Sequence, residues 1–405
     1  MKKHVFMILV AVLCFYIGGN AAYKRQEAPQ SVTITGFVFL DINENGIRDS
    51  REPGIPGVVV SDQVEAVASD SMGAYRIADS KGYGIAFISI PDNYASNGPF
   101  WKHIKNNSGR FEADFPLIRS GKAEEFAFIH ASDPHLSEAS LPRLLKFNAI
   151  VDSVKPAFVL MTGDLVLDSL RVPENEARSY FELYKREIAK LSIPVWSIPG
   201  NHEIFGIERD YSLVSSEHPL YGKKMYRHYL GPDYYSFNYG GVHFIGLNTV
   251  DYHQLWYYGH LDDTQLAWLE KDLSFVAPKT PVVTFNHIPF YSTVQTLIGY
   301  RDSMRSPMLI NVNGEKTSQH TVANAQSALA LLRTHTHSLA LAGHIHARER
   351  LTYEYEGSQV RFIQVSAILG DSTFAGMKMI SGVILYRVKN GEIDDGEFIP
   401  LEKAE

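Results

Sequence analysis

The sequence predicts an α/β domain of the α+β type, preceded by a small all-β domain. Beyond residue 124, short apolar runs of strand length alternate with longer stretches of helical periodicity. Before residue 120, short alternating runs are separated by turn-forming Gly, Pro and Asn residues. The first pattern is typical of layered α/β domains, and the second is typical of a β-sandwich.

The all-β domain is predicted over residues 32–120. Residues 32–40 alternate between apolar and polar positions, as in a strand with one buried face. Turn-rich segments then separate shorter apolar runs, so further strands are expected at 58–61 and 74–77.

The α/β domain is predicted over residues 124–400. Eight apolar runs are expected to form strands, at 126–132, 157–162, 195–199, 242–248, 282–286, 339–342, 361–366 and 383–388. Four stretches of helical periodicity are expected to form helices, at 141–154, 174–191, 264–275 and 323–335.

Residues 1–22 have the pattern of an export signal. Lys2 and Lys3 precede an apolar run at 5–17, and the small residues that follow would permit cleavage. This run is shorter than the ~20 residues that span a bilayer comfortably. We therefore expect a polar linker at 23–31 in an exported protein, periplasmic or extracellular. An uncleaved membrane anchor is the alternative.

The amino-acid composition argues against two classes of function, nucleic-acid binding and catalysis by a thiol. The formal net charge is -7, and no basic stripe occurs, so electrostatics give no reason to expect nucleic-acid binding. The single cysteine, Cys14, lies inside the predicted signal, so catalysis by a thiol is excluded for the cleaved chain. Oligomeric state is left open.

Polar side chains follow five of the predicted strands, at the point where each strand ends. In open α/β sheets, ligands bind beyond the carboxyl ends of the strands. Imidazole and carboxylate groups suit first-row divalent metals, and one carboxylate can bridge two ions ~3.5–4 Å apart. Glycines precede three of these residues and would let the chain turn sharply. The residues are Asp133, His135, Asp164, Asn201, His202, His287, His344 and His346.

This set resembles the complete signature of the calcineurin-like metallophosphoesterases, in particular exported bacterial members with an N-terminal β-sandwich. The resemblance covers about residues 124–400. It implies a four-layer αββα fold with two central sheets, and the hydrolysis of small phosphate esters with two divalent ions (Mn, Fe or Zn). The motifs are Asp133-x-His135, Gly163-Asp164, Gly200-Asn201-His202-Glu203, His287 and Gly343-His344-x-His346.

The same resemblance implies a role for each residue. Asp133, His135 and His346 would hold the first ion. Asn201, His287 and His344 would hold the second, and Asp164 would bridge the two. A metal-bridging hydroxide would attack phosphorus. His202 is next to a ligand without being one, which makes it the candidate general acid, with a structural role as the alternative.

Several details stay open at this point. Glu203 would either orient His202 or cap the segment that follows it. Purple acid phosphatases, a related branch, have a tyrosine at the position of Leu167, so a ferric–tyrosinate site is not expected. The aromatic segment 256–259 would either line a substrate cleft or pack on the fold. His130 and His243, inside strands, are expected to be hydrogen-bonded, and six other histidines, among them His337, are expected on the surface or in loops.

The substrate is also open. The enzyme would be a phosphomonoesterase or a phosphodiesterase, with a nucleotide or cyclic-nucleotide phosphodiesterase as the runner-up. A non-catalytic surface-binding protein on the same fold is the alternative of another class. The complete set of ligands favours an enzyme, because a decayed site should have lost members.

A second metal motif lies in the all-β domain, at residues 41–52. Its spacing matches a twelve-residue calcium loop, in which Gly46 permits the sharp turn. A strand precedes it and Pro53 follows, unlike an EF-hand, and it resembles calcium-loop β-sandwiches of bacterial surface proteins. An acidic turn without metal is the alternative. The candidate ligands are Asp41, Asn43, Asn45, the Ile47 carbonyl, Asp49 through water, and Glu52.

Overall fold

The computed structural model describes residues 32–105, 109–121, 123–294, 308–355, 358–374 and 376–402. The predicted signal and linker lie outside these residues. No helix within the described ranges combines the length and the apolar character needed to cross a bilayer.

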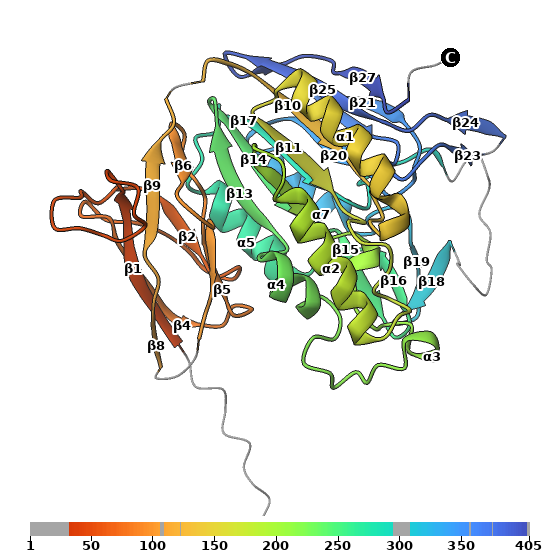
Figure 1. The fold of residues 1–405 in the computed structure, drawn as a ribbon, viewed down its shortest axis with the longest axis horizontal. Helices are drawn as coiled ribbons and strands as arrows, with labels where there is room; N and C mark the ends of the chain where they lie inside the picture. The colour runs from red at the N-terminus through yellow and green to blue at the C-terminus, as the bar shows by residue number, and fades with distance from the viewer. Residues whose placement is uncertain are drawn as a thin grey trace, which may run out of the picture.

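The N-terminal region forms two facing sheets, as expected for a sandwich (Figure 1). One sheet has the order β4 (Ala74–Ser80), β1 (Val32–Leu40), β9 (Phe115–Arg119) and β6 (Tyr94–Ser96), with β8 (Arg110–Glu112) also beside β1. The other has the order β3 (Ala66–Ala68), β2 (Val59–Ser61), β5 (Ile85–Ile88) and β7 (Trp101–His103).

The rest of the chain is built on two six-stranded mixed sheets. The first has the order β12 (Val195–Ile198), β11 (Phe158–Thr162), β10 (Glu125–Ala131), β25 (Gly382–Lys389) and β26 (Glu392–Ile393), with β27 (Glu397–Pro400) beside β25. The second has the order β13 (Tyr235–Tyr239), β14 (Val242–Leu247), β17 (Pro281–Asn286), β20 (Thr336–Ala342), β22 (Ser358–Gln364) and β21 (Glu349–Tyr355).

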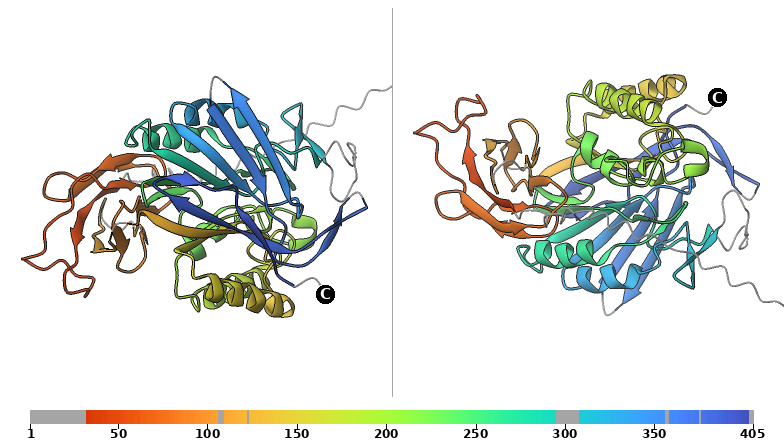
Figure 2. Two further views of the ribbon diagram at one scale, coloured as in Figure 1. Left: turned by 90° about the horizontal axis from the view of Figure 1, so that it is seen from above. Right: turned by 90° about the horizontal axis from the view of Figure 1, so that it is seen from below.

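Helices cover the outer faces of both sheets, which gives the predicted four layers (Figure 2). The helices are α1 (Leu141–Val154), α2 (Glu174–Ile188), α3 (Arg209–Ser212), α4 (Lys224–Leu230), α5 (Asp263–Leu273) and α7 (Ala325–Leu332). Helices α1 and α2 lie outside the first sheet, and α5 and α7 lie outside the second. Three hairpins decorate the edges: β15 (Val250–His253) with β16 (Trp256–Gly259), β18 (Leu309–Val312) with β19 (Glu315–Ser318), and β23 (Ser372–Phe374) with β24 (Met377–Met379).

The predicted strands and helices are all present, and no end moves by more than three residues. Local signals explain this agreement. Helix α5, for example, begins where the Asp262 carboxylate accepts the Gln265 N–H at 2.8 Å. The face of α2 that carries Phe181 and Tyr184 is buried. Edge strand β21 was not predicted, because its sequence is largely polar and exposed.

The two sheets pack through aromatic side chains. The ring of Phe128 on β10 meets Phe244 on β14 edge-on, with centroids 5.6 Å apart. Phe158 on β11 meets Phe237 on β13 at 5.4 Å. These fully or almost fully buried rings lock the sheets face to face. The carboxyl ends of strands from both sheets thereby open onto one region.

The β-sandwich is joined to the two-sheet region by buried polar contacts. The Gln63 side chain is fully buried and donates to Asp233 Oδ1 at 2.9 Å. Tyr234 donates its hydroxyl to the Gln63 carbonyl. The Trp268 indole N–H donates to Ser61 Oγ at 3.1 Å. Such contacts are costly to break, because each leaves a buried polar group without a partner.

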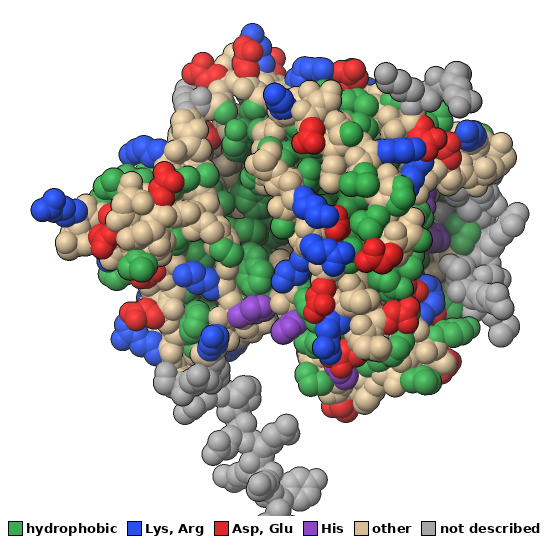
Figure 3. All heavy atoms as spheres, in the orientation of Figure 1, with side chains coloured by type: hydrophobic (Ala, Val, Ile, Leu, Met, Phe, Trp, Pro, Cys, Tyr) green, Lys and Arg blue, Asp and Glu red, His purple; other side chains and the backbone are tan. Residues whose placement is uncertain are grey.

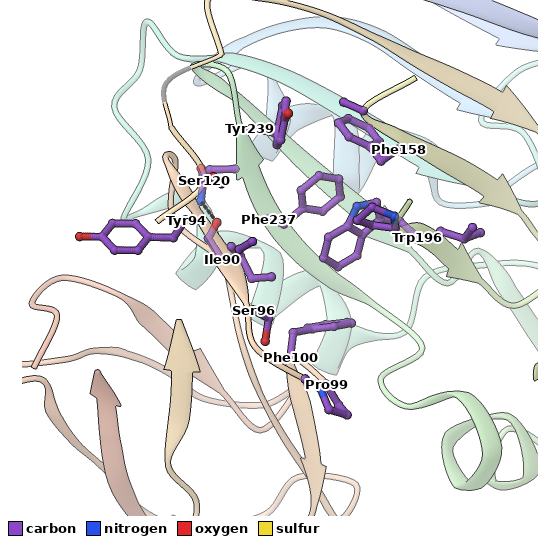
Figure 4. Close-up of a pocket in the computed structure, with 16 residues that line it drawn as sticks. Ile90, Tyr94, Ser96, Pro99, Phe100, Ser120, Phe158, Trp196, Phe237 and Tyr239 are labelled. Atoms are coloured by element: carbon purple, nitrogen blue, oxygen red, sulfur yellow. Dashed lines mark hydrogen bonds between the residues drawn. The ribbon is translucent and has the colours of Figure 1, made fainter. Parts of the chain in front are cut away.

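An aromatic cavity of about 280 Å³ also lies between the two regions (Figure 4). Phe100, Trp196, Phe237 and Tyr239 are among its lining residues. A hollow lined with hydrophobic side chains is visible there in the space-filling view (Figure 3). Its other lining residues include Ala157, just before β11, so the cavity sits at the amino ends of β11 and β12. It is therefore separate from the polar residues at the carboxyl ends.

Candidate metal centre

The structure brings the seven residues predicted as metal ligands together, at the carboxyl ends of five strands. Two clusters of potential ligand atoms share Asp164. Asp133, His135, Asp164 and His346 form the first, and Asp164, His287 and His344 form the second. Asn201 joins the second cluster, since its Oδ1 lies 3.1 Å from His287 Nε2.

The first cluster has the spacing of a metal site. His346 Nε2 lies 3.1 Å from both His135 Nε2 and Asp133 Oδ1. Asp164 Oδ2 lies 3.5 Å from His135 Nε2. Ligands ~2.0–2.2 Å from an ion and at right angles to each other are themselves about 3 Å apart. One ion therefore fits among these atoms.

The second cluster has the same spacing around the other carboxylate oxygen. Asp164 Oδ1 lies 3.1 Å from His287 Nε2. His344 Nδ1 lies 3.2 Å from the same nitrogen. Asp164 thus points one oxygen at each cluster, as a carboxylate that bridges two ions must do.

A buried acceptor without a donor supports the fit to a cation. Asp133 Oδ1 is buried and accepts no hydrogen bond of good geometry among the described atoms, although His346 Nε2 is 3.1 Å away. Imidazole nitrogens in both clusters also face one another. Carboxylate and imidazole groups that converge in this way are suited to a divalent cation.

The electrostatics of Asp164 point the same way. Burial raises the pKa of this carboxyl, but positive charge on His287 and His202 outweighs that effect and holds the pKa well below its usual range. Burial lowers the pKa of His287, but Asp164 more than reverses this and raises it to about 9. The carboxylate therefore needs a positive partner, which is a proton on His287 when no ion is bound.

The backbone at the site is strained. Five of the ligand residues have positive φ angles, a region that residues other than glycine rarely occupy. Strain of this kind is typical of functional sites, where the surrounding structure enforces it. The residues are Asp133 (φ 54°), His135 (40°), Asp164 (48°), His344 (74°) and His346 (55°).

The glycines before the ligands are needed mainly because a side chain would not fit there, and less because the chain turns sharply. This corrects part of the prediction. Gly163 has a positive φ of 88°, as a sharp turn requires. Gly200 has a φ of -103°, which any residue can adopt. A Cβ atom at Gly200 would instead lie 2.2 Å from Asp164 Oδ1. This glycine is required because the chain passes directly against the bridging carboxylate.

His202 stands beside both clusters with its ring anchored. Its Nδ1 bonds the Leu167 carbonyl, and its backbone N–H donates to Asp164 Oδ1 at 2.9 Å. Its Nε2 is 3.9 Å from Asp164 Oδ2. Glu203 accepts the N–H groups of Gly200 and Val166, so it caps this segment instead of orienting His202.

For the histidines outside the ligand set, the structure confirms some predictions and corrects others. His243 is hydrogen-bonded through both ring nitrogens, as expected. His130 bonds Thr162 through Nε2, but its buried Nδ1 has no partner among the described atoms. His337, predicted on the surface or in a loop, is instead buried inside β20 and bonds Thr284. The sequence had not marked it because strand β20 begins three residues before the apolar run.

Two residues near the centre were missed or left open. Tyr257, in the 256–259 segment, is buried with its ring centroid 5.8 Å from that of His344. His320 bonds His344 directly, Nδ1 to Nε2, at 2.8 Å. No spacing motif contains His320, and only the folded chain brings it to the site.

The 41–52 loop of the sandwich folds back on itself. Asp41 accepts the N–H groups of Asn45 and Gly46, and Glu52 accepts those of Ile42 and Asp49. Asn43 and Asn45 donate to Asp49. The predicted side chains are thus gathered in one loop, with most of their oxygens already bonded to backbone N–H groups.

Comparison with known proteins assigns the family. The model of the calcineurin-like phosphoesterases matches residues 126–348, more than half of the chain. A model described as the N-terminal domain of calcineurin-like phosphoesterases matches residues 42–120. The chain belongs to the calcineurin-like phosphoesterase family. The two clusters that share Asp164 fit the two-metal type of site that this family suggests.

Individual relatives match over shorter stretches. A manganese-dependent ADP-ribose/CDP-alcohol diphosphatase of Xenopus tropicalis is 33% identical over 61 residues, 15% of this chain and 18% of the relative. A probable glycerophosphodiester phosphodiesterase of Arcobacter nitrofigilis is 25% identical over 136 residues, 33% of this chain and 43% of the relative. The chain thus spans less than half the length of each of these relatives.

A solved structure described as a dimetal phosphatase from Danio rerio resembles the fold more broadly. It covers 68% of this chain and 99% of its own, with a TM-score of 0.43 and 15% identity.

Proposed function

We propose that the protein hydrolyses phosphate esters of small molecules, with His202 as the general acid. Two divalent cations, of Mn, Fe or Zn, held by the clusters around Asp164 would activate water as the nucleophile and offset negative charge on the phosphoryl oxygens. Asp133, His135 and His346 would hold one ion, and Asn201, His287 and His344 the other.

The position of His202 carries the proposal. Its Nδ1 bonds the Leu167 carbonyl, so Nδ1 donates and Nε2 is left to face the centre. Its ring lies edge-on to that of His135, with centroids 4.4 Å apart. A protonated Nε2 at this place can donate to the oxygen of a leaving alcohol, the step in which phosphate esters with poor leaving groups need help.

A nucleotide diester or diphosphate is the second candidate substrate. The named activities of the two relatives both concern a phosphate that joins two groups. Tyr257 lies beside His344 but is buried, so its ring packs on the fold and is not offered to a planar base.

A panel of substrates tests both ideas. Purified protein, loaded with Mn²⁺ or with Zn²⁺, would be given an aryl phosphomonoester, an aryl phosphodiester, a cyclic nucleotide and a nucleoside diphosphate ester. Asp164→Ala is the matched control for contaminating phosphatase. We expect hydrolysis of at least one class that the control lacks. Failure on every class with both metals would contradict the proposal.

For the 41–52 loop we propose a calcium ion as ligand. Asp41 and Glu52 are only 2% and 6% exposed, which is unusual for carboxylates, and a calcium ion would add charge neutralisation to the hydrogen bonds that they already accept. The order of oxygen-bearing residues matches that of known calcium loops. The ion would tie the loop to the end of β1.

We also propose that the mature protein is exported and begins near residue 22. The short apolar run and the small residues after it support this. Mass spectrometry of the protein recovered from its native cells measures the N-terminus. A mature chain that retained Met1 would contradict the proposal and favour an uncleaved anchor.

A further inference from the structure

His344 uses both of its ring nitrogens. Its Nδ1 faces the second cluster, 3.2 Å from His287 Nε2. Its Nε2 points away from the cluster and lies 2.8 Å from Nδ1 of His320. The two rings have centroids 5.0 Å apart and are inclined by 34°. His320 therefore contacts the far side of a ligand without reaching the cluster itself.

The chemistry of imidazole fixes the direction of this hydrogen bond. A neutral imidazole has one N–H, and the nitrogen that binds a metal must be the other one. If His344 ligates through Nδ1, its proton is on Nε2, and His320 Nδ1 must accept it. We propose that His320 is a positioning residue, which holds the ring and the tautomer of His344 ready for the second ion.

The segment around His320 is itself firmly held. The buried Gln319 side chain donates to the Tyr257 carbonyl at 3.0 Å, and its backbone N–H donates to the Met308 carbonyl at 3.1 Å. The hydroxyl of Ser318 accepts the His320 N–H. The Val322 N–H donates to the Pro289 carbonyl at 3.0 Å. A fixed backbone lets His320 fix His344 in turn.

His287 provides an internal comparison. It belongs to the same cluster, but its Nδ1 is oriented by a main-chain acceptor, the Thr162 carbonyl, at 2.7 Å. A carbonyl cannot be removed by substitution, whereas the acceptor of His344 is a side chain. The contact between His320 and His344 can therefore be tested directly. Outer contacts of this kind typically change metal affinity by ~10–100-fold when they are removed.

The inference rests on the proposed two-metal centre, so the test must separate the two. Metal-free protein would be titrated with Mn²⁺ by calorimetry, and its paramagnetic resonance spectrum recorded for the signal of a coupled pair. His320→Leu keeps bulk but removes the acceptor. His320→Asn returns an acceptor, since the amide Oδ1 falls close to the position of Nδ1. His335→Ala, outside the centre, is the control.

We expect His320→Leu to bind one Mn²⁺ as the unmutated protein does and the other ~10–100-fold more weakly, with loss of the coupled-pair signal. His320→Asn should recover most of the affinity. Equal titrations for the unmutated protein and His320→Leu would overturn the assignment of His320. A failure of the unmutated protein to bind two ions would instead overturn the two-metal centre.

Misfolding is separated from lost positioning by melting each variant without metal. Equal melting temperatures mean that any weaker binding comes from the site. If His320→Leu melts early, His320→Asn decides the matter. A folded His320→Asn with affinity close to that of the unmutated protein supports positioning, and a folded His320→Asn with ~10–100-fold weaker binding of one ion contradicts it.

Discussion

The two metal-type sites of this chain are built in opposite ways. The metal centre gathers side chains that follow five different strands. Its first and last ligands in the sequence, Asp133 and His346, are 213 positions apart. The loop at 41–52 draws its candidate ligands from a single short segment. In the centre, a buried oxygen of Asp133 accepts no hydrogen bond of good geometry among the described atoms. In the loop, Asp41 and Glu52 already accept backbone N–H groups.

This difference indicates how far the structure of each site depends on a bound ion. The loop is stabilised by its own hydrogen bonds, so a bound ion would add to a structure that already exists. The centre has a strained backbone and converging acceptors, so the surrounding fold holds these groups in place for a cation. We therefore expect removal of a ligand to have a far larger effect in the centre than in the loop.

The largest expected effect is that of Asp164→Ala. The substitution removes the carboxylate that faces both clusters, so neither cluster keeps its full set of ligands. Metal content, measured by plasma emission spectroscopy, should fall well below two ions per chain, and phosphoesterase activity should fall below detection. Retention of two ions per chain would mean that Asp164 does not bridge.

His202→Ala should separate catalysis from metal binding. Every proposed ligand remains, so metal content should stay near that of the unmutated protein. Loss of a general acid costs ~10²–10⁴ in rate. The loss should be large for an alkyl phosphate ester and smaller for a nitrophenyl ester, whose leaving group needs little protonation.

Equal losses for the two esters would indicate that His202 binds the phosphoryl group instead. Loss of metal in His202→Ala would mean that the assignment of ligands is wrong.

The loop should respond more weakly and only to calcium. Asp41→Ala should lower the melting temperature relative to the unmutated protein when calcium is present. Binding to the folded state at 100 times Kd stabilises by about 2.7 kcal/mol. Asp70→Ala, in an ordinary turn of the same sandwich where Asp70 accepts two N–H groups, is the matched control. Identical melting of the unmutated protein with and without calcium would remove the calcium proposal.

A buried histidine outside both sites should change the free energy of unfolding only within a limited range of pH. Burial lowers the pKa of His337 to about 4. The unfolded chain takes up this proton near pH 6.5 and the folded chain does not, so stability should fall as pH drops from about 6.5 towards 4. The contribution of this one group is at most about 3 kcal/mol.

His337→Gln keeps an atom able to bond Thr284 and does not titrate. Urea unfolding between pH 4 and 7 should therefore show a shallower slope for His337→Gln than for His335→Gln, a nearby half-buried control. Equal slopes would mean that His337 is protonated in the folded state.

The strand ends of the centre could be predicted because their signals are local. An apolar run followed by Gly-Asp or Gly-Asn-His-Glu can be recognised from a few consecutive residues. The order of these motifs along the chain places the ligands at one edge of the sheets. The left-handed conformations of Asp133 and His344 could not be predicted, since tertiary packing imposes them. His320 lies 24 positions from His344, on a loop without a motif.

The contact of Gln63 with Asp233 could not be predicted from the sequence either. The two residues are 170 positions apart, and neither belongs to a recognisable motif. Asp233 also holds the Arg227 guanidinium, at 2.7 Å and 2.9 Å, and the Asn248 amide at 2.8 Å. A residue of the sandwich thus completes a network inside the two-sheet region.

The contact made by Gln63 has a consequence for any attempt to produce the two-sheet region without the β-sandwich. The two family matches divide the chain near residue 120, and a shortened chain cut at that division would begin with residue 123 or so. It would leave Asp233 short of a donor, the Trp268 indole without its acceptor, and the apolar wall around Trp196 open to water. We therefore expect a chain cut at this division to be less stable than the whole chain.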